Sequence, residues 1–468
     1  MPTLVIPTVI VLLASAIPAR AEVLGEIVVT ARKYDVSPQD LPIAIAIFSG
    51  SSLQGASNVA DEFDPADLVS RLEAQIIFQD LVTSEHYERA RHVGERLVEL
   101  TKAEFGEQSM EVAQVLEALA EIQRRAGEYD DAEENFLTSI EMIGDEDGMF
   151  SEHLIDPLIG LATNYRHAGD GLAAMIVYNE ARSLSRRVFG LFNEGQIDIL
   201  DQMSETLIEM SLFEDAHDQQ VKALGLAERI QGTDSLELLP AIYKYAHWLR
   251  SLGWYTAERV QYVRAIDIVT EHSGQESPEL AIPLRETANS FRAQRLGDGR
   301  GEGSLKRALS ILEAQENIDK LAIAETLRDL GDWKVAFSKA RMDGTEYTRA
   351  WKLLGDVESG EALRTEWFEQ SDYVLFEQPN LRGLVNENSE PGAKPGFVLL
   401  VFDINERGRS ENVVVVESSP PGLKDDAVAR AVRQSRFRPG IRNGEIVRTT
   451  MVSHQVTFFY KPEEASTG

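Results

Sequence analysis

Cysteine is absent from this 468-residue chain, which excludes disulfides, catalytic thiols and thiolate metal sites. Aromatic residues are also scarce, at 7%, and the abundance of Ala, Leu and Glu favours helices over a large sheet. Basic residues are few: 46 Lys and Arg stand against 77 Asp and Glu, for a net charge of −31. Because a field of this sign repels nucleic acid, we expect no DNA or RNA partner.

Catalytic and metal-binding patterns are missing as well. The eight histidines are scattered, and no pair has helical metal-ligand spacing. The sequence has no nucleophile elbow and no glycine fingerprint that joins a strand to a helix. His454 falls in a predicted strand and is interpreted as an edge side chain rather than a base. We therefore expect a protein that is not an enzyme and uses no cofactor or metal.

The N-terminal segment carries an export pattern. Residues 2–18 are nearly all apolar or small, and Ala19 and Ala21 flank Arg20 as in a small-x-small cleavage site. This pattern predicts that residues 1–21 are a signal peptide and that the protein reaches the periplasm. An apolar run of roughly 17 residues is also at the lower limit for crossing a bilayer, so an uncleaved inner-membrane anchor remains the alternative.

A repeat of 42 or 43 residues runs through residues 62–355. One column of the repeat is large and aliphatic: Leu116, Leu158, Leu200, Ile242, Leu284 and Leu327. Four residues after each of these stands a small residue: Ala120, Ala162, Ser204, Ala246, Ala288 and Gly331. Small residues at this spacing allow two helices to cross at a short distance.

A second column lies about twenty residues later in each unit. Its members are mostly small: Leu97, Ser139, Ala181, Ala223, Ala265, Ala308 and Ala350. Each unit is therefore predicted to be two amphipathic helices. The pattern resembles tetratricopeptide repeats, in the longer form of the kinesin-light-chain type. A solenoid of this kind offers a surface for an unidentified protein partner, or it serves as a spacer, and the sequence leaves both interpretations open.

The pattern changes after Gly355. Prolines and glycines in residues 356–395 predict a linker, and residues 462–468 a short tail. Between them, residues 396–404 and 413–417 are apolar and β-branched, residues 423–435 are amphipathic, and residues 448–460 form a last strand. Asn443-Gly444 is a strong tight-turn signal. We expect a mostly α protein: an α-solenoid followed by a small α+β domain of order strand, strand, helix, strand over residues 396–461.

Several motifs of this domain occur in a recognisable order. They are Ser418-Ser419, the helix over residues 425–432, Arg436-Phe437-Arg438-Pro439 and the Asn443-Gly444 turn. Together they resemble the TonB C-terminal domain closely. The resemblance implies that the last strand pairs with the TonB box, a short extended peptide of TonB-dependent outer-membrane receptors. The candidate peptide-binding residues are Thr449, Thr450, Met451, Val452, Ser453, His454, Gln455, Val456, Thr457 and Phe458.

Basic residues cluster between Arg430 and Arg442 in this domain. They are interpreted as a solvated helix end, with docking on the acidic solenoid or on an acidic receptor segment as the alternatives.

A second resemblance follows the signal segment, in residues 22–61. Its core is similar to the TonB box of a TonB-dependent receptor: Glu26, Ile27, Val28, Val29, Thr30 and Ala31. The segment is interpreted as an exported tail without function or a remnant of a gene fusion, or else as a strand that adds to a TonB-type sheet edge of this chain or of another transducer.

These features predict a TonB-family protein that resembles an energy transducer and supports transport across the outer membrane. In this interpretation, a membrane attachment couples the protein to an inner-membrane proton channel complex. The alternative is a soluble periplasmic adaptor that binds proteins without transmitting energy.

Overall fold

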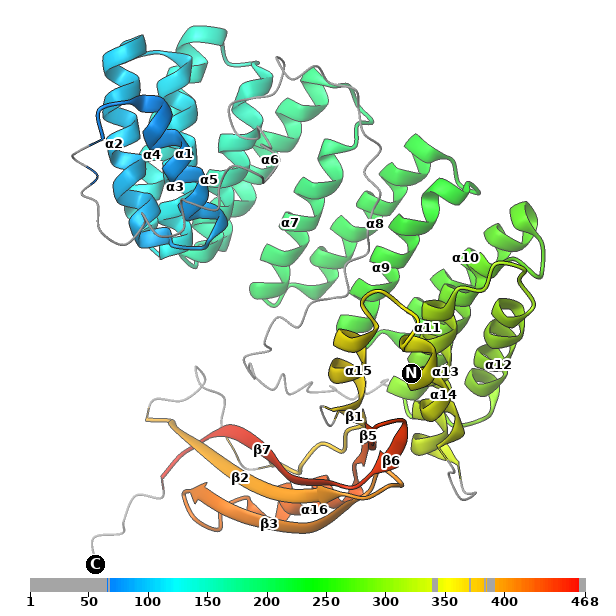
Figure 1. The fold of residues 1–468 in the computed structure, drawn as a ribbon. Helices are drawn as coiled ribbons and strands as arrows, with labels where there is room; N and C mark the ends of the chain where they lie inside the picture. The colour runs from blue at the N-terminus through cyan, green and yellow to red at the C-terminus, as the bar shows by residue number, and fades with distance from the viewer. Residues whose placement is uncertain are drawn as a thin grey trace, which may run out of the picture. The chain divides into compact units, whose positions relative to one another are not determined.

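The computed structural model describes residue 65 and residues 68–338, 344–369, 372–382, 384 and 392–462. These residues fall into two compact units, one ending at Tyr245 and the other beginning at Ala246. The signal segment and the TonB-box-like segment lie outside the described residues. Most of the described chain is helical, and the helices come in consecutive antiparallel pairs (Figure 1). The expected class, an α-solenoid of tetratricopeptide-like repeats followed by a small α+β domain, is confirmed.

The first unit contains four helix pairs in the described residues and the start of a fifth. In chain order the helices are α1 (Arg71–Thr83), α2 (Tyr87–Phe105), α3 (Met110–Ala126), α4 (Tyr129–Asp147), α5 (Ile155–His167), α6 (Gly171–Val188), α7 (Gly195–Glu209) and α8 (Phe213–Gln231). Helix α9 (Leu239–Ser251) continues into the second unit. Short 3-10 turns, η3 (Glu152–Leu154) and η4 (Leu236–Leu238), precede α5 and α9.

The two predicted columns form the interior of the repeats. Every residue of the aliphatic column and every residue of the second column is at most 6% exposed. Large side chains that lie one turn before the second column, such as Phe136, Tyr178 and Tyr347, are buried as well. At Gly331 a Cβ would lie 2.4 Å from Cε1 of Tyr347, so only glycine allows the tyrosine ring to approach this closely.

A third periodic feature marks the junction between consecutive repeats. Gly106, Gly148, Gly190, Gly232 and Gly274 follow one another at 42-residue steps, and all have φ between 87° and 99°. Three residues after four of these glycines stands a serine whose hydroxyl caps the next helix, as Ser109 Oγ does by accepting from Val112 N at 3.3 Å. Each Gly-x-x-Ser junction thus ends one helix and starts the next.

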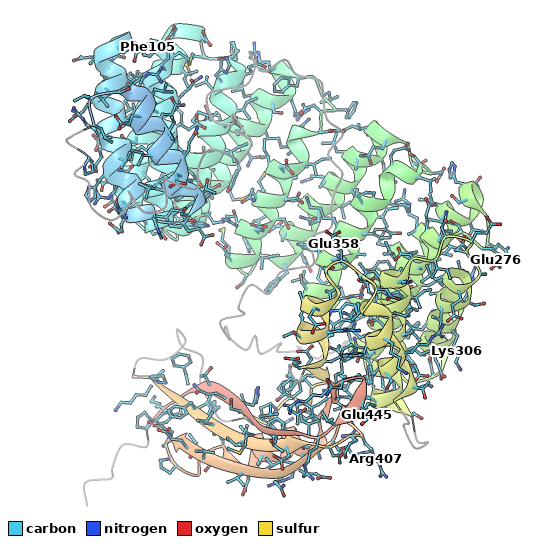
Figure 2. All side chains as sticks on the ribbon, in the orientation of Figure 1. Phe105, Glu276, Lys306, Glu358, Arg407 and Glu445 are labelled. Carbon is cyan, nitrogen blue, oxygen red and sulfur yellow. The ribbon has the colours of Figure 1, made fainter. Side chains whose placement is uncertain are left out.

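The second unit contains the remaining repeats. Its helices are α10 (Tyr255–Ser273), α11 (Ala281–Ala293), α12 (Arg300–Glu313), α13 (Lys320–Phe337), α14 (Thr345–Leu354) and α15 (Gly360–Phe368), with the turn η5 (Pro278–Leu280) before α11. Charged side chains such as Glu276 and Lys306 point outward from this unit (Figure 2). They give the acidic chain a solvated surface.

The C-terminal domain of this unit is built around a three-stranded antiparallel sheet of order β3-β2-β7. The strands are β2 (Lys394–Ile404), β3 (Ser410–Ser419) and β7 (Thr449–Tyr460), and helix α16 (Asp425–Gln434) packs against β2 and β3 (Figure 1). Alternate residues of β2 are buried, namely Val398, Leu400, Phe402 and Ile404. They form the core together with Val428 and Val432 of α16.

Short strands complete the domain. β5 (Gly440–Arg442) and β6 (Glu445–Val447) form a hairpin whose turn is Asn443-Gly444, with φ of 52° and 80°. These positive values at both turn residues match the type I′ geometry that the Asn-Gly signal predicts. Residues 356–395 were expected to be a linker, yet they contain α15 and β1 (Tyr373–Leu375). Strand β1 pairs with β4 (Arg436–Phe437), so this segment contributes to the folded domain.

Candidate peptide-binding edge

Strand β7 is an edge of the three-stranded sheet. It pairs with β2 on one side, in an unbroken register from Lys394↔Tyr460 to Phe402↔Val452. Among the described residues no strand pairs with its other side. Half of the backbone N–H and C=O groups of such a strand point away from the sheet, where another extended chain can bond to them.

The side chains of β7 include none of the charged residues or prolines that commonly prevent an edge strand from pairing with other chains. Natural edge strands are commonly guarded by lysine, proline or inward-pointing charges that prevent pairing with other chains. Between Thr449 and Tyr460 there is no Lys, Arg, Asp, Glu or Pro. The exposed residues of the regular part are Ser453, Gln455 and Thr457, which are small or neutral. The edge is therefore long, uncharged and chemically suited to accept a strand.

The predicted binding residues do not all have the same geometry. Met451 has a left-handed φ of 61°, its side chain is 75% exposed, and its N–H donates to Oδ1 of Asp403 at 3.2 Å. The register with β2 shifts at the same place. The bulge separates Thr449 and Thr450 from the rest, so the regular free edge begins at Val452 and extends through Phe459 and Tyr460, two residues beyond the predicted set.

Asp403 holds this bulge in place. Its carboxylate also accepts from Asn412 Nδ2 at 2.7 Å and from Arg448 at 3.3 Å. The hydrogen bond from Asn412, with those from Met451 and Arg448, keeps the pKa of Asp403 below its ordinary value. Because β2, β3 and the start of β7 meet at one carboxylate, the starting point of the free edge is determined by the sheet itself.

His454 lies at the middle of β7 on the covered face of the sheet. Its ring packs edge-on against Tyr373 of β1, with centroids 5.3 Å apart, and against Phe376 at 6.1 Å. Burial lowers the pKa of His454, so the neutral imidazole is favoured. The ring thus helps to fix β7 against β1, and the hydrogen-bonding edge of the strand stays separate from this contact.

The opposite edge of the sheet, β3, is less regular. Its register with β2 shifts at two places, and Asn412 has a left-handed φ of 53°. Its outward residues Val414 and Val416 are 58% and 60% exposed. A bulged strand offers a shorter run of evenly spaced backbone groups, which makes β7 the better candidate for strand addition.

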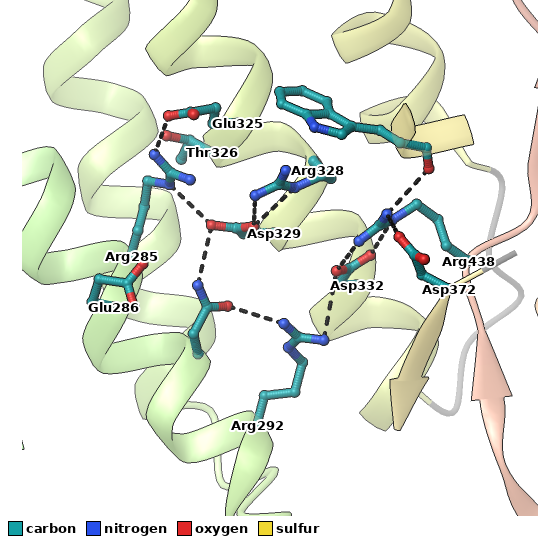
Figure 3. A network of polar contacts seen from close by, with 12 residues as sticks. Arg285, Glu286, Arg292, Glu325, Thr326, Arg328, Asp329, Asp332, Asp372 and Arg438 are labelled. Carbon is teal, nitrogen blue, oxygen red and sulfur yellow. Dashed lines mark hydrogen bonds and ion pairs between the residues drawn. The ribbon is translucent and has the colours of Figure 1, made fainter. Parts of the chain in front are cut away.

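The domain contacts the last repeats through Arg438 of the Arg-Phe-Arg-Pro motif (Figure 3). Its guanidinium donates from Nε and Nη2 to the two oxygens of Asp332 in α13, at 3.0 and 2.9 Å. A further N–H group donates to the Trp367 carbonyl at 3.1 Å and to Asp372 at 2.8 Å. Arg438 is 8% exposed and Asp332 1% exposed, so this is a buried, bidentate ion pair.

Neighbouring groups complete the network. Tyr347 of α14 donates its hydroxyl to Asp332 at 2.8 Å, and Arg292 of α11 donates to the Val374 carbonyl of β1 at 2.9 Å. Burial alone would raise the pKa of Asp332, but Arg438 and Arg292 outweigh it and hold the pKa below its ordinary value. Of the basic cluster, Arg430, Arg433 and Arg442 are exposed as expected, whereas Arg438 docks on the solenoid.

Sequence comparison identifies the domain. Residues 392–460 match the family model described as Gram-negative bacterial TonB protein C-terminal. The chain carries a TonB C-terminal domain. The match begins four residues before the predicted boundary at Gly396 and includes all of β2, β3, α16 and β7.

Part of the chain is similar to solved structures of repeat proteins at low identity. The C-terminal part of a TPR repeat-containing protein from Cytophaga hutchinsonii is 11% identical, with a TM-score of 0.36, and the match covers 62% of this chain and 95% of that one. BtubC (BKLC) from P. vanneervenii is 14% identical over 58% and 98% of the two chains, with a TM-score of 0.34. A tetratricopeptide repeat protein from Parabacteroides merdae is 17% identical over 64% and 96%, with a TM-score of 0.32. No curated protein shows significant similarity to the chain.

Two further properties concern the described residues only. None of their helices is long and apolar enough to cross a membrane. No group of three or more His, Asp or Glu side chains in that part of the chain is arranged to hold a metal ion. The candidate cleavage residues Ala19 and Ala21 and the TonB-box-like residues Glu26 to Ala31 lie outside it.

Proposed function

We propose that this protein is a periplasmic TonB-family protein that binds TonB-box peptides of outer-membrane receptors by strand addition to β7, in support of transport across the outer membrane. The observation that carries the proposal is the free edge from Val452 to Tyr460, which is regular, uncharged and without a strand partner in the described residues. A peptide strand satisfies the backbone groups of such an edge.

Affinity at this edge is expected to be modest. Four or five backbone hydrogen bonds contribute roughly 1 kcal/mol each, before the cost of ordering the peptide is subtracted. Binding of this strength is rapidly reversible, which suits a contact that is made and broken with each transported ligand.

The test uses the TonB-box-like sequence of the chain itself, EIVVTARK, as a labelled peptide. The protein is the full chain with residues 26–33 deleted, so that its own segment does not compete. Two modified peptides carry N-methyl groups on alternate backbone amides, one on the odd and one on the even positions. Strand addition uses every second amide, so one modified peptide should bind at least tenfold more weakly and the other should bind unchanged.

The location of binding is measured by hydrogen exchange. Protection on peptide addition is expected at amides between Val452 and Tyr460 that point away from β2. Equal weakening by both N-methyl patterns, or protection confined to β3, would rule out strand addition at β7.

The TonB-box-like segment is a second element of the proposal. If residues 26–33 pair with β7 of the same chain, the deletion variant should bind EIVVTARK more tightly than the full chain does. Equal affinity of the two forms would show that the segment does not occupy its own edge.

A soluble periplasmic adaptor is the second candidate, and the helical repeats favour it because solenoids are suited to bind proteins. The two candidates differ in attachment to the membrane, because a protein without such attachment cannot transmit force from an inner-membrane proton channel complex. N-terminal sequencing of the mature protein separates them. A protein that begins at Glu22, after cleavage at Ala21, supports the adaptor, whereas retention of Met1 supports the transducer.

A further inference from the structure

A cavity in the first unit gathers positive charge in an otherwise acidic chain. It lies between α6, α7 and α8 and has a volume of about 320 Å³. Arg182 and Arg186 of α6 line one side, and Lys222 and Arg229 of α8 line the other. None of its lining residues is acidic, although Asp and Glu outnumber Lys and Arg by 77 to 46 in the whole chain.

In the part of the chain that the structure describes, these four cations lack carboxylate partners. No Asp or Glu oxygen of the described residues lies within ion-pair distance of any of them. The Nε of Arg182 is buried without an acceptor in that part of the structure. Burial and the neighbouring Arg186 lower the pKa of Arg182. The nearest partners of the other two are neutral: Gln219 for Lys222, at 3.4 Å, and the ring of Phe192 for Arg229, at 4.9 Å.

The repeat provides an internal control. Residues 42 positions before and after the four cations occupy the equivalent positions of the preceding and following repeats. Each of these two sets contains only one basic residue. The sets are Ile140, Gly144, Glu180 and Arg187 in the preceding repeat, and Leu224, Glu228, Arg264 and Glu271 in the following repeat. The solenoid fold therefore does not require cations at these positions. Of the three sets compared, only the set that lines this cavity has four basic residues.

The apolar part of the cavity is preformed. Leu200 and Leu226 form its buried floor, and Leu191 and Phe192 are half exposed at its rim. The rim loop is braced by Asn193, whose Nδ2 donates to the carbonyls of Ser185 and Gly190 at 3.2 and 2.8 Å. Gln196 donates to the Leu191 carbonyl at 3.1 Å. An apolar rim that is held open in this way can receive a side chain without first refolding.

We propose that this cavity binds an acidic peptide segment of a partner protein. An apolar side chain of the peptide enters between Phe192 and Leu226, and flanking carboxylates pair with Arg182, Arg186, Lys222 and Arg229. The volume is at the lower end of the range of about 300–1,000 Å³ for ligand sites, which fits one or two side chains rather than a long ligand.

The proposal is tested with the full chain and a labelled peptide of sequence DEFDELDE. Two control peptides separate its features: NQFNQLNQ keeps the apolar residues without charge, and DESDESDE keeps the charge without them. The protein variants are Arg182→Gln/Arg186→Gln and a charge-matched control, Lys102→Gln/Lys352→Gln, which removes two exposed cations elsewhere. Thermal unfolding of each variant establishes that it is folded.

DEFDELDE should bind the wild-type chain and the control variant equally, and the Arg182/Arg186 variant at least tenfold more weakly. Both control peptides should bind at least tenfold more weakly to the wild-type chain, and raising the salt concentration should weaken DEFDELDE. No binding of DEFDELDE at millimolar concentration, or equal binding to the Arg182/Arg186 variant, would overturn the proposal. So would loss of binding to phosphatidylglycerol vesicles in that variant with unchanged peptide binding, since this result would indicate a membrane surface.

Discussion

Two buried carboxylates, one in each unit, have opposite electrostatic neighbours. In the second unit opposite charges are brought together: Arg438 pairs with Asp332, and Arg285 donates to Asp329 at 2.9 Å. In the first unit Glu117 instead lies close to two other carboxylates, Asp156 and Glu121, of which Glu121 also pairs with Arg124. Buried opposite charges need each other, so a pair of this kind holds two elements in one arrangement. Like charges repel one another, so a buried carboxylate among them keeps its proton to a higher pH.

Removal of Asp332 should have the largest effect on this comparison. Asp332→Ala leaves the buried Arg438 with Asp372, which is half exposed, as its remaining carboxylate partner, and this should lower the free energy of unfolding of the second unit by about 3 kcal/mol. Urea denaturation followed by the fluorescence of Trp333 and Trp367, both buried close by, measures the change. The double variant Asp332→Leu/Arg438→Met removes both charges and should recover most of the loss. A double variant as unstable as the single one would contradict the role given to the ion pair.

Glu117 should show an intermediate effect that depends on pH. Burial, then repulsion by Asp156 and Glu121, raises its pKa to about 7. Because the folded protein holds this proton more tightly than the unfolded chain, stability should fall as the pH rises from about 5 to about 8. Glu117→Gln removes this slope and should gain on the order of 2 kcal/mol at about pH 8. Denaturation of the first unit at several pH values tests this, with the exposed Glu141→Gln as the control. A slope in Glu117→Gln as steep as that of the wild-type chain would refute the assignment.

The smallest effect is expected at an exposed pair. Glu361 is 85% exposed and contacts Arg364 at 3.1 Å on α15. Glu361→Ala should change stability by less than about 0.5 kcal/mol, because solvent screens the pair. The same denaturation assay provides the value. A loss comparable to that of Asp332→Ala would mean that burial does not separate the two kinds of pair.

Local patterns accounted for most of the secondary structure. The aliphatic and small columns predicted the helix pairs because each residue type has the same neighbours in every repeat. The Gly-x-x-Ser junctions, which were not recognised from the sequence, carry an equally clear signal at the same period. In the TonB domain the strand β2 and the Asn443-Gly444 turn could be predicted because their signals are also local patterns of residue types. Each of these signals depends on residues close together in the chain.

The candidate site was predicted less completely. The sequence indicated a last strand and, through the family resemblance, its role as an edge. It did not indicate that the regular edge starts at Val452, because the bulge at Met451 depends on Asp403, 48 residues away. The contact between His454 and Tyr373 was not predicted either. Tyr373 belongs to β1, which lies in a segment rich in proline and glycine that indicated only a linker.

The sequence by itself determined the repeat, the order of elements in the C-terminal domain and the absence of thiol chemistry, because these follow from composition and from patterns within about one repeat length. Tertiary structure alone decided which charges are paired. Asp332 and Arg438 are 106 residues apart, and Arg182 and Lys222 belong to different repeats, yet the fold brings each pair of positions to a common place. Electrostatic energy depends on distance in space and on burial, and neither can be read along the chain before it is folded.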